Sequence, residues 1–394
     1  MQKVVKLLSV IVYFSALLVW ADEGSKDCQS AEYKLDKQFE SGRFHDCQVL
    51  SDNQFTLTLQ PENQPINPSP WYAFKVTKLG QGLSPITINI RYPEFRFRYW
   101  PKMSVDGKQW SSLPKSDVDV DVQQSQFSLR LKVTEATTWI AAQPLISNSD
   151  YQLWLQQLLQ RDAKFVLKEI GESVQGRPIS MLSMSSQVSY PTIVLLGRQH
   201  PPEITGAMAM RAFVERISAN DPLSLQFRQQ FNLLVMPNIN PDGVAAGNWR
   251  YNANGIDLNR DWGPFTQPET QHIKRVIDDI AKVSEVWGML DFHSTWYDVM
   301  YTQEDQQMQK LAGFVASWLQ QLDAAKTDIS FKRKSSHNTS KPTTKSYFFE
   351  RFHTPSITFE LGDDSDPRAI AEVATIAAEL YMQNMLQQRA KVAQ

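Results

Sequence analysis

From about residue 150 onward, apolar runs of strand length alternate with longer runs of helical periodicity. The strand-like runs are Thr192–Leu196, Asn232–Met236, Val286–Phe292 and Ser356–Glu360. The helix-like runs are Tyr151–Arg161, Ile204–Ile217, Glu269–Val283, Asp305–Leu322 and Pro367–Arg389, the first capped by Ser149 or Asp150. This alternation predicts a layered α/β domain over residues 146–394. In such domains, catalytic groups collect on loops at the ends of strands.

A different pattern covers residues 22–145. Phe55–Leu59, Ile86–Ile90 and Phe127–Val133 alternate apolar and polar residues with a period of two, and Gly-rich turn signals separate them. Short strands with regular turns predict an antiparallel β-sandwich. Its many aromatic residues indicate a packed core and inter-domain contacts, although a ligand-binding aromatic stripe is the alternative. These aromatic residues are Trp71, Tyr72, Phe74, Tyr92, Phe95, Phe97, Tyr99, Trp100 and Trp110.

Residues 1–21 have the pattern of a targeting segment. Lys3 and Lys6 precede an apolar stretch from Leu7 to Trp20, and the small residue Ala21 follows it. This pattern predicts a secretory signal peptide cleaved after Ala21, and therefore an exported protein, periplasmic or secreted. A short membrane anchor is the alternative, although the stretch is shorter than the roughly 20 apolar residues that span a bilayer. No other segment is long and apolar enough to span, so we expect no stable membrane span after cleavage.

Only two cysteines are present, Cys28 and Cys47. In an oxidising compartment we expect them to form a disulfide bond, and two unlinked thiols are the alternative. The formal net charge is −2 and no lysine–arginine block occurs, which argues against nucleic acid as a partner.

The loop after the run ending at Gly197 carries the first candidate metal ligands. His200 and Glu203 are three residues apart, and one tight turn puts both side chains on the same side. An imidazole nitrogen and a carboxylate oxygen held there can bind zinc. On these two residues alone, a solvated polar turn is an equally good explanation.

Three further segments carry polar groups suited to chemistry. A long loop rich in Asn, Gly and Asp, residues 238–262, contains Arg250 and Arg260, which are suited to gripping a carboxylate. His293 ends one apolar strand, and Glu360 ends another. Taken alone, such a histidine is more often structural than a metal ligand, and such a glutamate is more often a paired structural acid.

Together and in this order, these pieces resemble the zinc carboxypeptidases of the carboxypeptidase A superfamily. The matching motifs are His-x-x-Glu, Asn-Pro-Asp-Gly, Arg-x4-Gly-x-Asp-Leu-Asn-Arg-x-Trp, Asp-Phe-His and Thr-Phe-Glu. The Arg198-x-His-Pro opening and the Arg250 to Arg260 spacing resemble the cytosolic-carboxypeptidase-like branch, which also carries an N-terminal β-sandwich. The resemblance therefore implies a three-layer α/β/α catalytic domain with a mixed sheet behind an antiparallel sandwich.

The resemblance also implies roles for individual residues. His200, Glu203 and His293 would bind one Zn²⁺ per chain and leave a fourth position for water, whose pKa would fall towards about 7. Glu360 would take the proton of that water and pass it to the leaving amine. Arg250 would stabilise the oxyanion that develops on the scissile carbonyl.

The implied substrates are the C-termini of peptides or proteins. Asn259 and Arg260 would hold the terminal carboxylate. Arg198 is also expected to bind substrate. The chain departs from the pancreatic members at Pro202, where they carry arginine. It also has no assured counterpart of their mobile tyrosine; Tyr347 is a candidate, with packing as the alternative.

Lys345 lies about where the family places the base of the side-chain pocket. A lysine there would favour an acidic C-terminal residue, and a solvated surface lysine is the alternative. The predicted function is thus that of a zinc-dependent metallocarboxypeptidase with a preference for acidic C-terminal residues. A murein-peptide amidase and a catalytically silent binding protein of the same fold are the alternatives.

Overall fold

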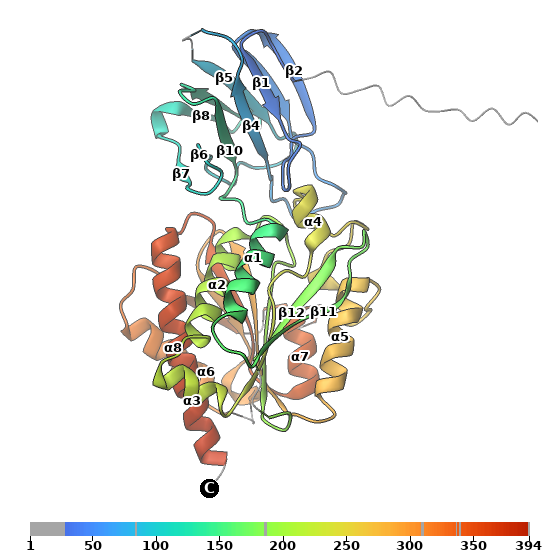
Figure 1. Ribbon diagram of the computed structural model, residues 1–394, viewed down its shortest axis with the longest axis vertical. Coiled ribbons are helices and arrows are strands. Elements are labelled where there is room, and N and C mark those ends of the chain that lie inside the picture. Colours follow the sequence, from blue (N-terminus) through green and yellow to red (C-terminus); the bar gives the residue numbers. More distant parts are fainter. Residues whose placement is uncertain are drawn as a thin grey trace, which may run out of the picture.

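A computed structural model describes residues 28–82, 85–184, 187–308, 311–335, 337–338 and 340–392. It has a smaller β domain stacked on a larger α/β domain (Figure 1). The expected signal peptide, residues 1–21, lies outside the described residues. In the described part of the chain, no helix combines the length and the apolarity that crossing a bilayer requires.

The smaller domain is the predicted β-sandwich, built from two sheets of five strands. The first sheet has the order β1 (Tyr33–Asp36), β4 (Ala73–Lys78), β10 (Thr137–Ala141), β6 (Lys102–Ser104) and β7 (Ser111–Ser112). The second has the order β2 (Asp46–Ser51), β3 (Gln54–Thr58), β5 (Ile86–Arg91), β9 (Gln126–Leu131) and β8 (Val118–Asp121). All pairs are antiparallel except β3 and β5, which are parallel because the chain crosses to the first sheet as β4 between them.

The core of the sandwich comes from the inward residues of the period-two strands. Phe55, Leu57 and Ile88 are fully buried, and the aromatic residues Trp71 and Tyr99 are buried with them. At the boundary, the ring of Phe95 packs edge-on against Trp249 of the larger domain, with the centroids 4.9 Å apart. Cys28 and Cys47 are joined by a disulfide bond, with their Cα atoms 5.8 Å apart.

The larger domain is a mixed eight-stranded sheet between helices. The strand order is β11 (Phe165–Glu172), β12 (Pro178–Met184), β14 (Asn232–Met236), β13 (Thr192–Gly197), β15 (Val286–Thr295), β18 (Ser356–Gly362), β16 (Val299–Thr302) and β17 (Lys332–Ser335). The four central strands, β14, β13, β15 and β18, run parallel to one another. Because parallel strands end at the same edge, their carboxyl ends form one shared rim.

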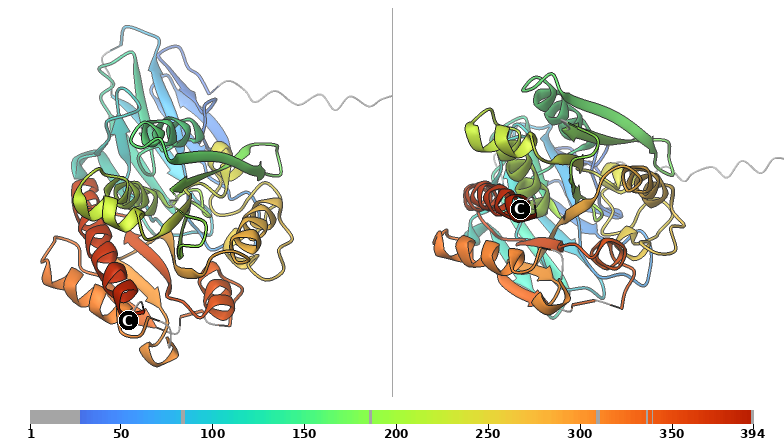
Figure 2. Two further views of the ribbon diagram at one scale, coloured as in Figure 1. Left: turned by 60° about the horizontal axis from the view of Figure 1, so that its bottom comes forward. Right: turned by 90° about the horizontal axis from the view of Figure 1, so that it is seen from below.

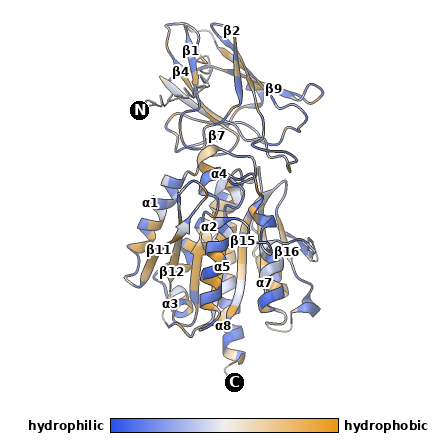
Figure 3. Ribbon diagram, turned by 90° about the vertical axis from the view of Figure 1, so that its right-hand side faces the viewer, coloured by the Kyte–Doolittle hydropathy of each residue, from blue (hydrophilic) through white to orange (hydrophobic). Residues whose placement is uncertain are grey.

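Helices cover both faces of this sheet. The helices are α1 (Asn148–Leu159), α2 (Ile204–Ile217), α3 (Pro222–Arg228), α4 (Pro241–Ala246), α5 (Pro268–Ile280), α6 (Phe314–Ala324), α7 (Thr344–Phe352) and α8 (Pro367–Val392). Helices α2 and α8 pack on one face, whereas α5 and α7 lie on the other (Figures 1 and 2). Hydrophobic residues gather along the central strands (Figure 3), which are buried on both faces.

Several boundaries differ from the sequence-based expectations. Helix α1 begins with Ser147 as its cap, because the Ser147 hydroxyl accepts from the backbone N–H of Asp150, whose carboxylate caps in return. The expected helix Asp305–Leu322 is a short 3-10 turn followed by α6, and Gly313, with φ of 75°, interrupts it. Strands β11, β12, β16 and β17 were not predicted; they form the two outer pairs of the sheet, beside the four parallel central strands that the apolar runs indicated.

Candidate active site

Two neighbouring parallel strands bring the three candidate metal ligands together. His200 and Glu203 lie on the turn between β13 and α2, and His293 lies near the end of β15, which pairs with β13. The close contact between α2 and β15 depends on Gly206, because a Cβ atom there would lie 2.3 Å from the carbonyl oxygen of His293. Only glycine lets the helix carrying Glu203 approach His293 this closely.

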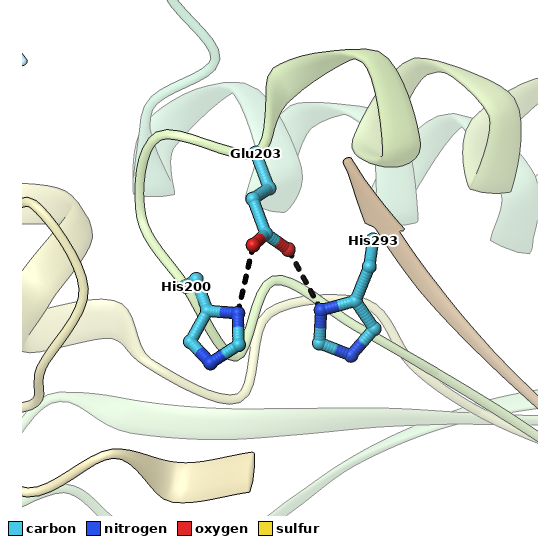
Figure 4. A group of neighbouring side chains, drawn as sticks. All are labelled: His200, Glu203 and His293. Carbon is cyan, nitrogen blue, oxygen red and sulfur yellow. Dashed lines mark hydrogen bonds and ion pairs between the residues drawn. The ribbon is translucent and has the colours of Figure 1, made fainter. Parts of the chain in front are cut away.

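The three side chains converge on one point at the rim of the sheet (Figure 4). The Nδ1 atom of His200 lies 2.8 Å from Oε1 of Glu203, and the Nδ1 atom of His293 lies 2.7 Å from Oε2. All three residues are buried, and one ligand atom from each lies within 4.8 Å of the others. The structure therefore brings together the residues that the sequence analysis chose as zinc ligands.

Two aspartates hold the outer nitrogens of these histidines. The Nε2 atom of His200 lies 2.9 Å from Asp257, and the Nε2 atom of His293 lies 2.8 Å from Asp291. A proton on each Nε2 would be donated outward, which turns the lone pair of Nδ1 towards the carboxylate of Glu203. Lone pairs that face one another in a buried space require a cation or a proton between them. Two imidazoles and one carboxylate are a donor set that zinc accepts, so the residues present fit the metal.

The ionisation of the ligands agrees with this picture. Burial alone would raise the pKa of Glu203, but the two histidines outweigh it and hold the pKa well below its ordinary value. Burial alone would lower the pKa of His293, but Asp291 and Glu203 outweigh it and raise the pKa well above the usual range. The centre is thus a compact arrangement of opposite charges at which a metal ion competes with protons.

Glu360 lies beside this centre on β18, where its partner in the strand register is His293. It lines the same cavity as the three ligands. Burial raises the pKa of its carboxyl group to about 7, although His293 and Arg250 act in the opposite direction. A carboxylate with a raised pKa at the edge of a metal centre is suited to accept and return a proton near neutral pH.

Arg250 reaches the cavity from the long loop before α5. Its Nε donates to Asp257 at 2.8 Å, so the aspartate that orients His200 also orients the guanidinium. The backbone around it is held by the sandwich, because the carboxylate of Glu62 accepts the N–H groups of Trp249, Arg250 and Tyr251 at 2.7–2.9 Å. The smaller domain therefore helps to build the catalytic loop.

The cavity also contains the other predicted carboxylate-binding residues. Asn259 accepts from the backbone N–H of Thr344 at 3.0 Å, and Arg260 donates to the carbonyl oxygen of Asn259 at 2.7 Å. Lys345, on the first turn of α7, lines the same cavity and is only 3% exposed. Among the described residues, the ammonium of Lys345 has no hydrogen-bond or ion-pair partner, and burial lowers its pKa to about 8. A buried cation of this kind is available for an anion that enters the cavity.

Two predicted substrate-binding residues lie elsewhere. Arg198 is buried, and its guanidinium donates to the carbonyl oxygens of Pro201 and Ile146 and to the hydroxyl of Tyr151. It ties the ligand loop to α1 and does not line the cavity. Tyr347 packs against the rings of Trp262 and Phe265, and its hydroxyl accepts from Arg351. The structure therefore does not bring Arg198 and Tyr347 together with the residues that line the cavity.

The structure also adds residues that the sequence analysis missed. Asp291 stands two positions before His293, and that proximity was a usable signal, whereas Asp257 lies 57 positions from His200 and gave no such signal. Asn67 and Arg98, from the sandwich, line the catalytic cavity together with Trp296. No feature of the sequence around Asn67 or Arg98 points to this placement.

Comparison with known proteins matches both domains. Residues 35–142 match the family described as Cytosolic carboxypeptidase N-terminal domain. Human cytosolic carboxypeptidase 6 is 23% identical over 265 residues, which cover 62% of this chain and 53% of that protein. The mouse protein of the same name is 24% identical over 62% of this chain and 49% of its own length. The chain thus spans about half the length of these curated relatives.

Solved structures show the same fold over most of the chain. A metallo-carboxypeptidase from Burkholderia cenocepacia superimposes with a TM-score of 0.77 and 18% identity, over 90% of this chain and 99% of that one. A metallo-carboxypeptidase from Pseudomonas aeruginosa, in complex with (2-guanidinoethylmercapto)succinic acid, has a TM-score of 0.71 and 19% identity. That alignment covers 90% of this chain and 100% of the other.

The strongest assignment concerns the catalytic domain. Residues 151–380 match the family described as Zinc carboxypeptidase, and this range includes the three candidate ligands, Glu360 and Arg250. The matched range is more than half of the chain. On this evidence, the chain belongs to the zinc carboxypeptidase family.

Proposed function

We propose that this protein is an exported zinc carboxypeptidase that removes one residue at a time from peptide C-termini and prefers glutamate or aspartate at that position. The observation that carries the proposal is one cavity containing His200, Glu203 and His293, the carboxyl group of Glu360, and the ammonium of Lys345, which has no partner among the described residues. Each group would serve one part of the reaction.

His200, Glu203 and His293 would hold the metal, with Asp257 and Asp291 fixing the orientation of the two rings. When bound there, zinc supplies an acidified water and polarises the scissile carbonyl. Glu360 accepts the proton of the attacking water and returns it to the leaving amine. The guanidinium of Arg250 donates to the oxygen on which negative charge develops.

The remaining groups select the end of a peptide chain. Arg260 and the amide of Asn259 bind the terminal carboxylate, which restricts cleavage to the last peptide bond. The ammonium of Lys345 pairs with the side-chain carboxylate of the terminal residue. Since Lys345 is buried without a partner among the described residues, this pairing relieves an uncompensated charge and favours acidic residues over neutral ones.

Replacing Lys345 with methionine tests the acidic preference. We expect kcat/KM for a peptide ending in glutamate to fall by about 30-fold or more, because a buried charge pair is lost. For the same peptide ending in leucine, kcat/KM should stay the same or rise. The matched control is Lys341→Met, since Lys341 is exposed four residues earlier. If wild-type enzyme cleaved the two peptides equally, or if Lys345→Met slowed both to the same extent, the acidic preference would be wrong.

Export is supported by the chemistry of the two cysteines. A disulfide between Cys28 and Cys47 persists in an oxidising compartment and is rare in the cytosol, and the pair follows shortly after the expected signal peptide. We expect the mature protein recovered from cells to begin at Asp22 and to contain no free thiol. Intact-mass measurement before and after reduction checks both features, and a cytosolic protein that retains residues 1–21 would contradict the proposal.

A further inference from the structure

One wall of the catalytic cavity belongs to the sandwich and not to the catalytic domain. Asn67 and Arg98, both from the smaller domain, line the cavity that also holds His200, Glu203 and Glu360. Arg98 lies in the segment between β5 and β6, and its ion pair with Asp363, directly after β18, places it at the rim of the central sheet. The sandwich therefore contributes polar side chains directly to the place where a peptide must lie.

Hydrogen bonds fix two of the three guanidinium nitrogens of Arg98. Its Nε donates to Asp363 at 2.8 Å, and its Nη1 donates to the hydroxyl of Ser69 at 2.5 Å and to the carbonyl oxygen of Pro68 at 3.4 Å. The side chain is 5% exposed. Among the described residues, Nη2 has no hydrogen-bond partner. A guanidinium that is fixed on two sides and lines a cavity presents its third nitrogen as a pre-oriented donor.

Trp296 forms the outer part of the same wall. The guanidinium carbon of Arg98 lies 5.3 Å from the centroid of the Trp296 ring, so the two side chains form a cation–π contact. The rest of Trp296 is open, since the residue is 56% exposed although it lines the cavity. An exposed indole at the mouth of a cavity is a surface on which a side chain of a bound peptide can pack.

The positions of the charged groups set the direction in which a peptide lies. Lys345 is on α7, which lies on one face of the sheet, and it lines the cavity together with Arg260. Asp363, the partner of Arg98, follows β18 and shares a hollow with Thr205 of α2, on the opposite face. Figures 1 and 2 show α2 and α7 on the two sides of the sheet. A terminal residue held by Arg260 and Lys345 would therefore leave the preceding residues to extend past the candidate metal ligands towards Arg98.

We propose that Arg98 and Trp296 form the subsite for the part of the peptide that precedes the scissile bond. Nη2 of Arg98 donates a hydrogen bond to the main-chain carbonyl oxygen of the residue two before the C-terminal one, and Trp296 packs against its side chain. This inference rests on the proposed carboxypeptidase function. It makes the sandwich a part of the substrate-binding site, and it makes longer peptides better substrates than dipeptides, which lack that carbonyl.

The test compares a dipeptide and a tetrapeptide that share their last two residues, Ala-Glu and Ala-Ala-Ala-Glu. The variants are Arg98→Lys, Arg98→Gln and Trp296→Ala, with Arg96→Gln as the matched control because Arg96 is exposed two residues away. Lysine can still form the ion pair with Asp363 that joins the two domains, but it has no second nitrogen that could donate to the peptide. The Tm of each variant shows separately whether the substitution has destabilised the contact between the two domains.

We expect Arg98→Lys to lower kcat/KM for the tetrapeptide by about tenfold or more, mainly through KM, and to leave the dipeptide almost unchanged. Trp296→Ala should act in the same direction, and Arg96→Gln should change neither substrate. Equal losses on both peptides, or no loss on either, would overturn the subsite while leaving the carboxypeptidase function intact. A wild-type protein that cleaves neither peptide would overturn the proposed function and this inference together.

Discussion

Replacing Glu360 with glutamine is expected to lower kcat by about 10²–10⁴-fold and to leave the zinc content at one per chain. Glutamine has nearly the same shape but cannot accept the proton of the attacking water. The ligands His200, Glu203 and His293 do not depend on the carboxylate of Glu360, so the metal should remain bound. Rate measurements on a glutamate-terminated peptide, together with metal analysis of the same samples, check both parts.

The stability of the variant separates a lost base from a damaged fold. Burial raises the pKa of Glu360 to about 7, so the folded metal-free protein favours the protonated form. Its ionised form therefore reduces the free energy of unfolding as the pH rises above the ordinary pKa of a glutamate and through 7. A neutral glutamine should leave the metal-free protein at least as stable at pH 8 as the wild type. Glu350→Gln, at an exposed position on α7, is the matched control. Turnover retained by Glu360→Gln would remove Glu360 from the proton-transfer role.

The three candidate metal ligands were identified through the resemblance to the zinc carboxypeptidases, and the fold explains why they meet. Helix α2 has the predicted bounds, Ile204–Ile217, and the loop before it had to stand at the end of a buried strand. His293 ends a second strand of the same apolar kind, and parallel strands end at one rim. Neighbouring strand ends and a tight turn explain how three side chains from distant positions meet, whereas the residues taken one by one left a polar turn and a structural histidine as alternatives.

Contacts between distant parts of the chain could not be predicted in the same way. Glu62 is 188 positions from Arg250, and Arg98 is 265 positions from Asp363. Neither pair lies within one element, so no periodicity or spacing links its members. These contacts depend on how the sandwich packs against the rim of the catalytic domain's sheet, and that arrangement arises from the packing of whole domains.

The orientation of individual side chains could not be predicted from the sequence either. Arg198 has a φ of 55°, and its guanidinium lies against α1 instead of the cavity. Tyr347 follows Lys345 by two positions on a helix, so the two side chains point to different sides. Lys345 lines the cavity and Tyr347 packs against Trp262. The sequence analysis predicted no helix around Lys345 and Tyr347, so it had no basis for separating the directions of these two side chains.

Replacing His293 with alanine should abolish both zinc binding and turnover. The variant leaves only His200 and Glu203 in the centre, and two ligands do not complete the three-residue set that a catalytic zinc site uses. We expect zinc to fall from one per chain to well below one after dialysis, and peptide hydrolysis to fall with it. The control is His45→Ala, since His45 is an exposed histidine of the sandwich.

Thermal unfolding gives this prediction a second readout. Zinc that binds only the folded state raises the free energy of unfolding, by about 4 kcal/mol at a free concentration one thousand times Kd. Added zinc should therefore raise the Tm of the metal-free wild type and of His45→Ala, but not that of His293→Ala. If His293→Ala kept one zinc per chain and the same zinc-dependent rise in Tm, His293 would not be a metal ligand, and the shared rim of β13 and β15 would not be the metal centre.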